Sequence, residues 1–127
     1  MLLQNTINTY YMRDKINDPV RLELMLQSIA NIEEYLTGVE RYDAFAKNKL
    51  LCHAVVYNIQ CIGEGVYMLS KEFKENHPQM DWEAIAGLRH VLVHDYYQVN
   101  IERIWMVIQQ DLQPLKQYLQ SILTESS

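Results

Sequence analysis

Apolar residues recur at steps of three and four positions through most of this 127-residue sequence. That spacing puts them on one face of an α-helix, which turns once in about 3.6 residues. The chain has only 4 glycines and 3 prolines, and an all-β chain needs many more turn-forming residues. The sequence therefore predicts an all-α protein of one domain, since this length supports one core and not two.

The first long helix is expected between Asp18 and Gly38. Asp18 is a good N-cap residue, Pro19 fits the first helical position and Gly38 is the natural terminator. One apolar stripe follows this segment: Leu22, Met25, Leu26, Ile29, Ile32 and Leu36.

A polar connection with one short helical turn at 43–47 leads to a second long helix over 50–77. Pro78 prevents that helix from continuing. Gly63 and Gly65 lie in its middle, where each glycine costs about 1 kcal/mol relative to alanine. Close approach of another helix or of a ligand would offset that cost.

Two further helices complete the pattern. Asp81 is placed to cap a helix over 82–98, and Asn100 to cap one over 101–123, which Pro114 either kinks or divides. Together these segments predict an up-down four-helix bundle with one short extra helix. We expect an N-terminal arm at 1–11, the helical domain at 12–123 and a frayed tail at 124–127.

Charge and cysteine content exclude several classes of protein. The net charge of −5 and the pI near 5.3 argue against a surface that binds nucleic acid over its whole extent, but not against one small cationic pocket. Cys52 and Cys61 are nine residues apart and form no zinc-binding spacing, so we expect reduced core thiols and a cytoplasmic protein. No signal peptide and no apolar run of about 20 residues is present, so no membrane contact is expected.

The second long helix carries apolar side chains on more than one face. Val56, Tyr57, Tyr67 and Met68 lie beside its main stripe. A helix that is apolar most of the way round is buried or meets a partner. This pattern favours a homodimer, unless the short connecting segment covers the surface.

The stretch RHVLVHDYY, residues 89–97, holds the most chemically capable side chains of the sequence. Arg89 and His94 are five residues apart, so on one straight helix they point about 140° away from each other. A site that uses both would lie where the helix end opens, or between two copies of the helix in a symmetric dimer.

An arginine and a histidine suffice to cleave RNA, because the substrate supplies its own 2′-hydroxyl nucleophile. Histidine can move the proton, and arginine can hold the phosphate as charge grows on it. This chemistry needs no metal or other cofactor, and no carboxylate cluster suited to two magnesium ions stands out. Tyr96 would project near the same helix end. From chemistry alone, a polar helix end with no catalytic role stays an alternative.

The stretch from Arg89 to Tyr96 fits the Arg-x4-His-x-Tyr signature of the HepT-like toxins, a branch of the HEPN superfamily of small helical ribonucleases. Three further segments resemble that family: IQCIGEGVYML, HPQMDWEAIAGLRH and the closing DYYQVNIERIWMVIQQDLQPLKQYL. The resemblance covers roughly residues 12–123.

The resemblance implies a bundle that dimerises through the motif helices, with a metal-independent ribonuclease site at the interface. It implies that Arg89 and His94 are the catalytic pair. It also implies a toxin–antitoxin pair, in which an MntA-type nucleotidyltransferase silences the toxin by transferring AMP to Tyr96. Larger assemblies with that partner are compatible with it. The alternatives are a non-catalytic nucleotidyltransferase substrate-binding protein and, less compatible with the intact motif, a helical dimer without ligand.

Two supporting residues and two departures from the family pattern accompany the motif. Glu64 is expected to approach Arg89 or a histidine, because Gly63 removes a side chain where the Arg89 helix would cross; a solvated carboxylate is the alternative. His90 stands where such proteins usually carry asparagine, and adds a titratable group. Gly65 replaces the family's alanine and is expected to loosen the helix.

The remaining cations and histidines have simpler interpretations. Three cations either steer RNA locally or are only solvated surface residues: Lys71, Lys74 and Arg103. The second interpretation is the simpler. We expect structural roles for His53 and for His77, which a helix C-terminus would favour.

Overall fold

The computed structural model describes residues 17–94 and 100–126, and for residues 90–94 and 126 it describes the backbone only. Within those ranges the chain is all helical and forms a bundle, as predicted. The helices are α2 Asp18–Tyr35, α3 Tyr42–Ala46, α4 Lys49–Met68, α5 Lys71–Asn76, α6 Trp82–His94, α7 Ile101–Gln110 and α8 Leu112–Ser126.

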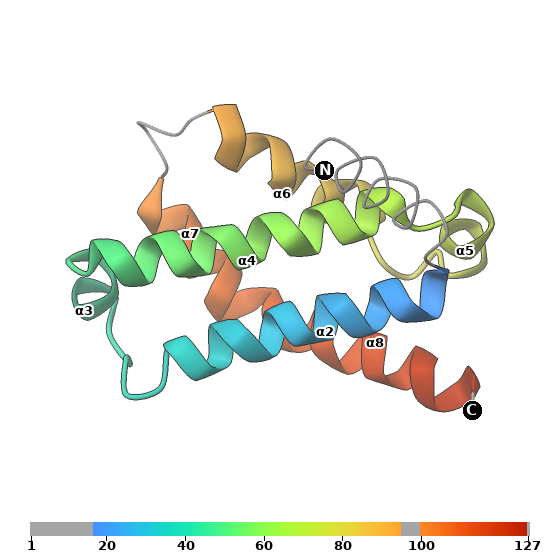
Figure 1. The fold of residues 1–127 in the computed structure, drawn as a ribbon, viewed down its shortest axis with the longest axis horizontal. Coiled ribbons are helices and arrows are strands. Elements are labelled where there is room, and N and C mark those ends of the chain that lie inside the picture. Colours follow the sequence, from blue (N-terminus) through green and yellow to red (C-terminus); the bar gives the residue numbers. More distant parts are fainter. Residues whose placement is uncertain (1–16, 95–99, 127) are drawn as a thin grey trace, which may run out of the picture.

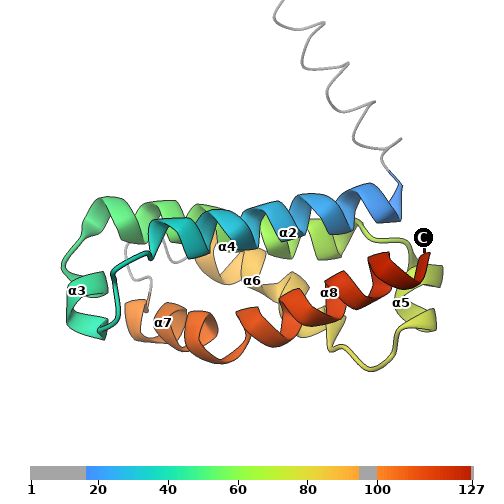
Figure 2. The same ribbon diagram turned by 90° about the horizontal axis from the view of Figure 1, so that it is seen from below.

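Helix α4 is the centre of the architecture (Figure 1). It lies beside α2 along most of its length, and the motif helix α6 packs on it from another side. Helices α7 and α8 follow one another along the opposite face of the molecule (Figure 2). The apolar stripes of α2, α4, α7 and α8 meet in one buried core, with Phe45 of α3 added at one end.

The core contains the residues that the helical spacing singled out. Leu22, Met25, Ile29 and Ile32 of α2 are buried. So are four residues of the α4 stripe: Val55, Ile59, Ile62 and Val66. At about 1.5–3 kcal/mol for each buried aliphatic side chain, this apolar burial is the main driving force for assembly of the helices.

The expected second helix over 50–77 is divided in two, which corrects the prediction. Helix α4 ends at Met68, and Leu69 adopts an extended conformation with its side chain in the core. The Ser70 hydroxyl then accepts from Phe73 N at 3.1 Å and starts α5. Capping by the Ser70 side chain therefore favours the start of a new helix over continuation of α4.

The first helix also begins one residue earlier than predicted. Asn17, not Asp18, is the N-cap, and its side chain accepts from Val20 N at 3.1 Å. The Asp18 carboxylate instead accepts from Ser70 N at 2.9 Å and from Ser70 Oγ at 2.6 Å. Asp18 therefore ties the start of α2 to the start of α5.

The predicted starts of the last two long helices are confirmed, whereas the predicted end of the motif helix at 98 lies outside the described residues, and α8 runs to Ser126, past the predicted end at 123. The side chains of Asp81 and Asn100 cap α6 and α7 as expected. The last helix is divided at Asp111, so Pro114 lies in the first turn of a new segment, one of the two outcomes foreseen for it. Gly38, with φ of 81°, turns the chain shortly after α2 ends. The four-helix count itself was too low, because α5 and the α7–α8 break add elements within the described residues.

Both cysteines are free. Cys52 is buried and its thiol donates to the carbonyl oxygen of Phe45, and burial raises the pKa of that thiol. Cys61 is only half-buried, so the expectation of a core thiol is met fully at Cys52 alone. Among the described helices, none is both long and apolar enough to cross a bilayer.

Candidate active site

Helices α4 and α6 approach each other most closely where Gly63 faces Arg89. A Cβ atom at Gly63 would lie 2.8 Å from Arg89 N, 3.2 Å from Ile85 O and 3.3 Å from Arg89 Cβ. Only a residue without a side chain fits at this crossing, which confirms the predicted reason for a glycine in mid-helix. The crossing fixes the backbone of Arg89 against α4.

The Arg89 side chain is held by two residues of α4. Its Cζ atom lies 3.3 Å from the centroid of the Tyr67 ring, and its Nη1 lies 3.5 Å from Glu64 Oε2. The Arg89 side chain is 22% exposed and that of Glu64 41%. Glu64 therefore pairs with Arg89, one of the alternatives that the sequence left open, and an aromatic face supports the guanidinium from a second direction.

The guanidinium keeps capacity to bind an anion. Its Nε is buried and finds no hydrogen-bond acceptor in the part of the chain that the structure describes. The contact with Glu64 is long for a hydrogen bond and engages one of five N–H donors. A planar cation at the edge of a helix pair, whose donors are not all satisfied within the described residues, is suited to a phosphate group.

Tyr67 is the site residue that the sequence argument missed. It had been grouped with the apolar side chains that suggested a dimer. The signal was present, because Tyr67 follows Glu64 by three residues and such pairs share one face of a helix. A glutamate that faces an arginine across a helix crossing thus predicts that its i+3 neighbour lies near the same arginine.

The start of α6 is anchored by an aromatic cluster. Trp82 Nε1 donates to His77 O at 2.8 Å, and the Phe73 ring lies 5.7 Å from the Trp82 ring and 4.3 Å from the His77 ring. Tyr118 of α8 contacts both Trp82 and His77, and burial, with Glu125 next in importance, raises the pKa of Tyr118. His77 therefore has the structural role expected of it, and His53 is exposed.

Part of the predicted site lies outside the described residues. His94 is the last residue of α6, and the helix is continuous from Arg89 to His94 in its backbone. The side chains of His90 and His94, and the whole of Tyr96, are outside the described set. Their roles stay predictions.

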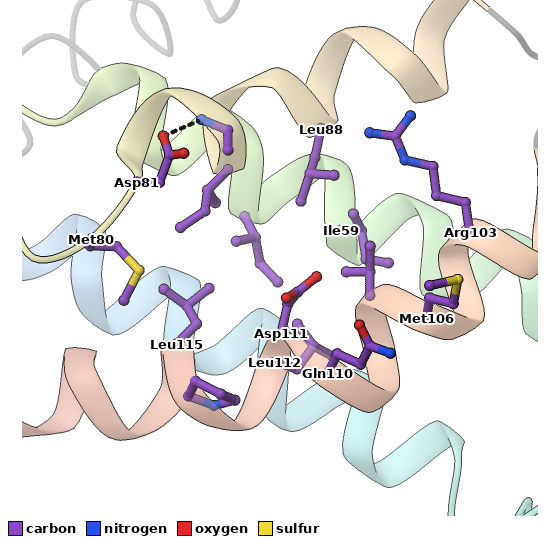
Figure 3. Close-up of a pocket in the computed structure, with 15 residues that line it drawn as sticks. Ile59, Met80, Asp81, Leu88, Arg103, Met106, Gln110, Asp111, Leu112 and Leu115 are labelled. Atoms are coloured by element: carbon purple, nitrogen blue, oxygen red, sulfur yellow. Dashed lines mark hydrogen bonds between the residues drawn. The ribbon is translucent and has the colours of Figure 1, made fainter.

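Two cavities border α6 on different sides. The smaller, of about 320 Å³, lies beside Arg89 and is lined by Tyr67, Lys74, Trp82, Glu83, Ala86, Gly87 and Arg89. The larger, of about 460 Å³, lies between α6 and the α7–α8 pair, with Leu88 and Met106 on its walls (Figure 3). Arg103 lines this larger cavity and not the one beside Arg89. The neighbouring residues Leu88 and Arg89 thus face separate cavities.

Gly65 has a packing explanation. A Cβ atom there would lie 2.6 Å from Met25 Cγ of α2. The space is therefore filled by a core methionine. The expectation of a loosened helix is wrong, because α2 and α4 pack closely there.

In the described part of the chain, no three His, Cys, Asp or Glu side chains come together in a group that could hold a metal ion.

Comparison with known proteins agrees with this arrangement. The family described as "Ribonuclease HepT-like" matches residues 25–122. A protein of Caldanaerobacter subterraneus named "Putative RNase" is 36% identical over 102 residues, which are 80% of this chain and 90% of the relative. A "Probable ribonuclease HepT" of Thermococcus cleftensis is 30% identical over 95 residues, or 75% of this chain and 86% of the relative.

A more distant relative from Methanocaldococcus jannaschii, also named "Putative RNase", is 26% identical over 98 residues, which are 77% of this chain and 89% of the relative. No solved structure matches. The family match spans the α4–α6 crossing and most of the helices that support it. The chain belongs to the HepT-like ribonuclease family.

Proposed function

We propose that this chain is a metal-independent endoribonuclease and the toxin of a toxin–antitoxin pair. The observation that carries the proposal is the state of Arg89, in a member of a ribonuclease family: its guanidinium is held by Tyr67 and Glu64, yet its Nε finds no acceptor among the described residues. In the proposed reaction the RNA 2′-oxygen attacks the adjacent phosphorus, and the bond from phosphorus to the 5′-oxygen breaks.

Each proposed residue has one task in that reaction. His94 takes the proton of the 2′-hydroxyl or gives one to the departing 5′-oxygen. Arg89 binds the phosphate and offsets the charge that develops on its oxygens. Glu64 orients the guanidinium, as carboxylates behind a catalytic group do. His90 is close enough in sequence to influence the acid–base balance.

The first test is cleavage of RNA by purified protein in the presence of a chelator. We expect wild type to cleave, and Arg89→Ala and His94→Ala each to lose at least about a hundredfold in rate, the usual size of an acid–base or phosphate contact. His53→Ala is the matched control, because His53 is exposed and the proposed chemistry does not use it. Cleavage that requires a divalent metal and survives both site variants would rule the mechanism out.

The toxin role is tested by growth. Expression of the wild type without a partner gene should arrest cells, and expression of the two site variants should not. A well-expressed, folded wild type that leaves growth unchanged and cleaves no RNA would favour the second candidate function, a non-catalytic partner of a nucleotidyltransferase. The exposed side chains of Leu50 and Tyr57 on α4 favour some partner surface in either case.

We further propose that an MntA-type nucleotidyltransferase silences the toxin by transferring AMP from ATP to the hydroxyl oxygen of Tyr96, with release of pyrophosphate and of the hydroxyl proton. The added phosphate would compete with substrate for Arg89 and His94. Tyr96→Phe should therefore fold and arrest growth, but resist neutralisation by an active transferase. Tyr97→Phe is the matched control and should be neutralised normally. Full neutralisation of Tyr96→Phe would show that modification at this residue is not the mechanism.

A further inference from the structure

The small cavity beside Arg89 has a composition that the proposed chemistry alone does not explain. Its walls combine two cations, Lys74 and Arg89, with the half-exposed ring of Tyr67, while Ala86 and Gly87 form part of its α6 side. Among the described residues that line it, Glu83 is the single carboxylate. At about 320 Å³ it is near the lower limit for ligand pockets, a size suited to one small unit and not to a long segment.

Gly87 is the first observation that points to an occupant. It lies inside α6, where glycine weakens a helix relative to alanine. A Cβ atom at Gly63 or Gly65 would clash with a neighbouring helix, but at Gly87 it would meet no atom of the described chain within 4 Å. Packing within the described residues therefore does not require a glycine at this position. Close approach of an outside molecule to the α6 backbone would require one.

Tyr67 and Lys74 indicate the chemistry of that molecule. Tyr67 is 52% exposed although the Arg89 guanidinium stacks on its ring. Lys74 Nζ lies 3.5 Å from the carbonyl oxygen of Tyr67, so its charge is held at the same end of α4. Proteins bind single-stranded nucleic acid with this pairing, in which aromatic rings stack on bases and nearby cations contact the backbone.

We propose that this cavity binds one nucleotide of the RNA strand adjacent to the scissile phosphate. The base packs against Tyr67 and the bare helix surface at Gly87, and the next phosphate contacts Lys74. The proposal rests on the proposed function, because it assigns the scissile phosphate to Arg89. It makes Tyr67, Lys74 and Gly87 substrate-binding residues that position the strand.

The test uses two variants that leave Arg89 and His94 in place. Gly87→Ala adds one methyl group to the cavity, and Lys74→Gln removes one cation. Lys71→Gln is the matched control, since Lys71 is on the same helix α5, is 90% exposed and pairs with Glu75 instead of lining the cavity. Binding is measured by fluorescence anisotropy with a short, non-cleavable 2′-O-methyl RNA strand of mixed sequence, and cleavage is measured on the matching RNA.

Gly87→Ala is expected to raise the melting temperature by about 3 °C, because alanine favours the helix, and to weaken binding at least about tenfold. Lys74→Gln should reduce the slope of log affinity against log salt by about 0.7, the value for one phosphate contact on a single strand. Lys71→Gln should leave slope and affinity near those of wild type. If Lys74 had a purely structural role, Lys74→Gln would change the melting temperature but not the slope of log affinity against log salt.

Each other result overturns a different statement. If wild type binds and cleaves but Gly87→Ala and Lys74→Gln match it, the nucleotide site is wrong and the ribonuclease proposal stands. If wild type binds without cleaving, the ribonuclease proposal fails and the binding data alone decide the nucleotide site. If Gly87→Ala instead changes the oligomeric state at unchanged RNA affinity, the cavity receives a second copy of the chain and not RNA. If wild type neither binds nor cleaves, both proposals fail, and if it cleaves without binding the strand, only the nucleotide site fails.

Discussion

At the scale of single residues, the position of Arg89 depends more on shape than on charge. The pair with Glu64 is long and partly exposed, so it stabilises the fold by less than about 1 kcal/mol. Stacking of the Arg89 guanidinium on the Tyr67 ring stabilises the fold by about 0.5–2 kcal/mol, and the larger value applies to a contact shielded from water. The backbone of Arg89, by contrast, lies so near Gly63 that a Cβ atom there would be 2.8 Å from Arg89 N, a clash that no side-chain rotation could relieve.

That contact gives a stability prediction for Gly63→Ala. The new methyl group gains about 1 kcal/mol in helix propensity, but it would lie 2.8 Å from Arg89 N, and overpacking of this kind costs about 1–3 kcal/mol or more. Because backbone atoms must move, we expect the upper end of that cost and a net loss of about 2 kcal/mol in urea unfolding. Activity should fall with it, since Arg89 is displaced.

Two other glycine variants are the controls for this prediction. Gly65→Ala contacts a methionine side chain, which can yield, so it should destabilise less than Gly63→Ala. Gly87→Ala should be slightly stabilising, because open space surrounds its Cβ position within the described chain. An order of stability with Gly63→Ala equal to or above Gly65→Ala would contradict the close helix crossing.

At the scale of elements, sequence periodicity predicted which segments are helical but not where two of them divide. Apolar spacing continues through Leu69, so the pattern gave no sign of the break that follows Met68. The break is stabilised by the local cap at Ser70, whose hydroxyl accepts from Phe73 N, and also by Asp18, which accepts two hydrogen bonds from Ser70 across 52 residues of sequence. No local pattern contains a partner that far away, and the same carboxylate was therefore misread as an N-cap.

The candidate site follows the same division between local and distant information. The position of Arg89 on a helix and the role of Gly63 as a crossing point were predicted from the sequence and are confirmed. The pair of Glu64 with Arg89 was one of the alternatives that the sequence left open for this carboxylate. The stack on Tyr67 was missed, because its ring had been interpreted only as apolar surface. The placement of the His94 and Tyr96 side chains stays a prediction.

At the scale of the whole molecule, the bundle leaves apolar surface uncovered along α4. Leu50 and Tyr57 are 81% and 65% exposed, so the short connection does not cover them. The pKa of Tyr57 is raised, mainly by its hydrogen bond with Cys61. A row of exposed apolar side chains beside a motif helix that packs chiefly on α4 is suited to a second subunit.

A second subunit would also resolve the geometry of the proposed catalytic pair. The backbone of helix α6 is continuous through His94, so positions 89 and 94 lie about 140° apart around the axis of one helix. We therefore propose a symmetric dimer in which Arg89 of one subunit acts with His94 of the other, so that each dimer has two composite sites.

This arrangement predicts that two inactive variants restore activity when they are mixed. Arg89→Ala and His94→Ala chains, unfolded together and refolded in equal amounts, should form mixed dimers in about half of the population. Each mixed dimer has one intact site, made from the unchanged Arg89 and the unchanged His94, so the mixture should regain about a quarter of wild-type cleavage. Wild type taken through the same refolding controls for recovery, and each variant refolded alone should stay inactive. A dimeric mixture that regains no activity would mean that Arg89 and His94 act within one chain, and the bend needed to bring them together would then have to lie in α6 itself.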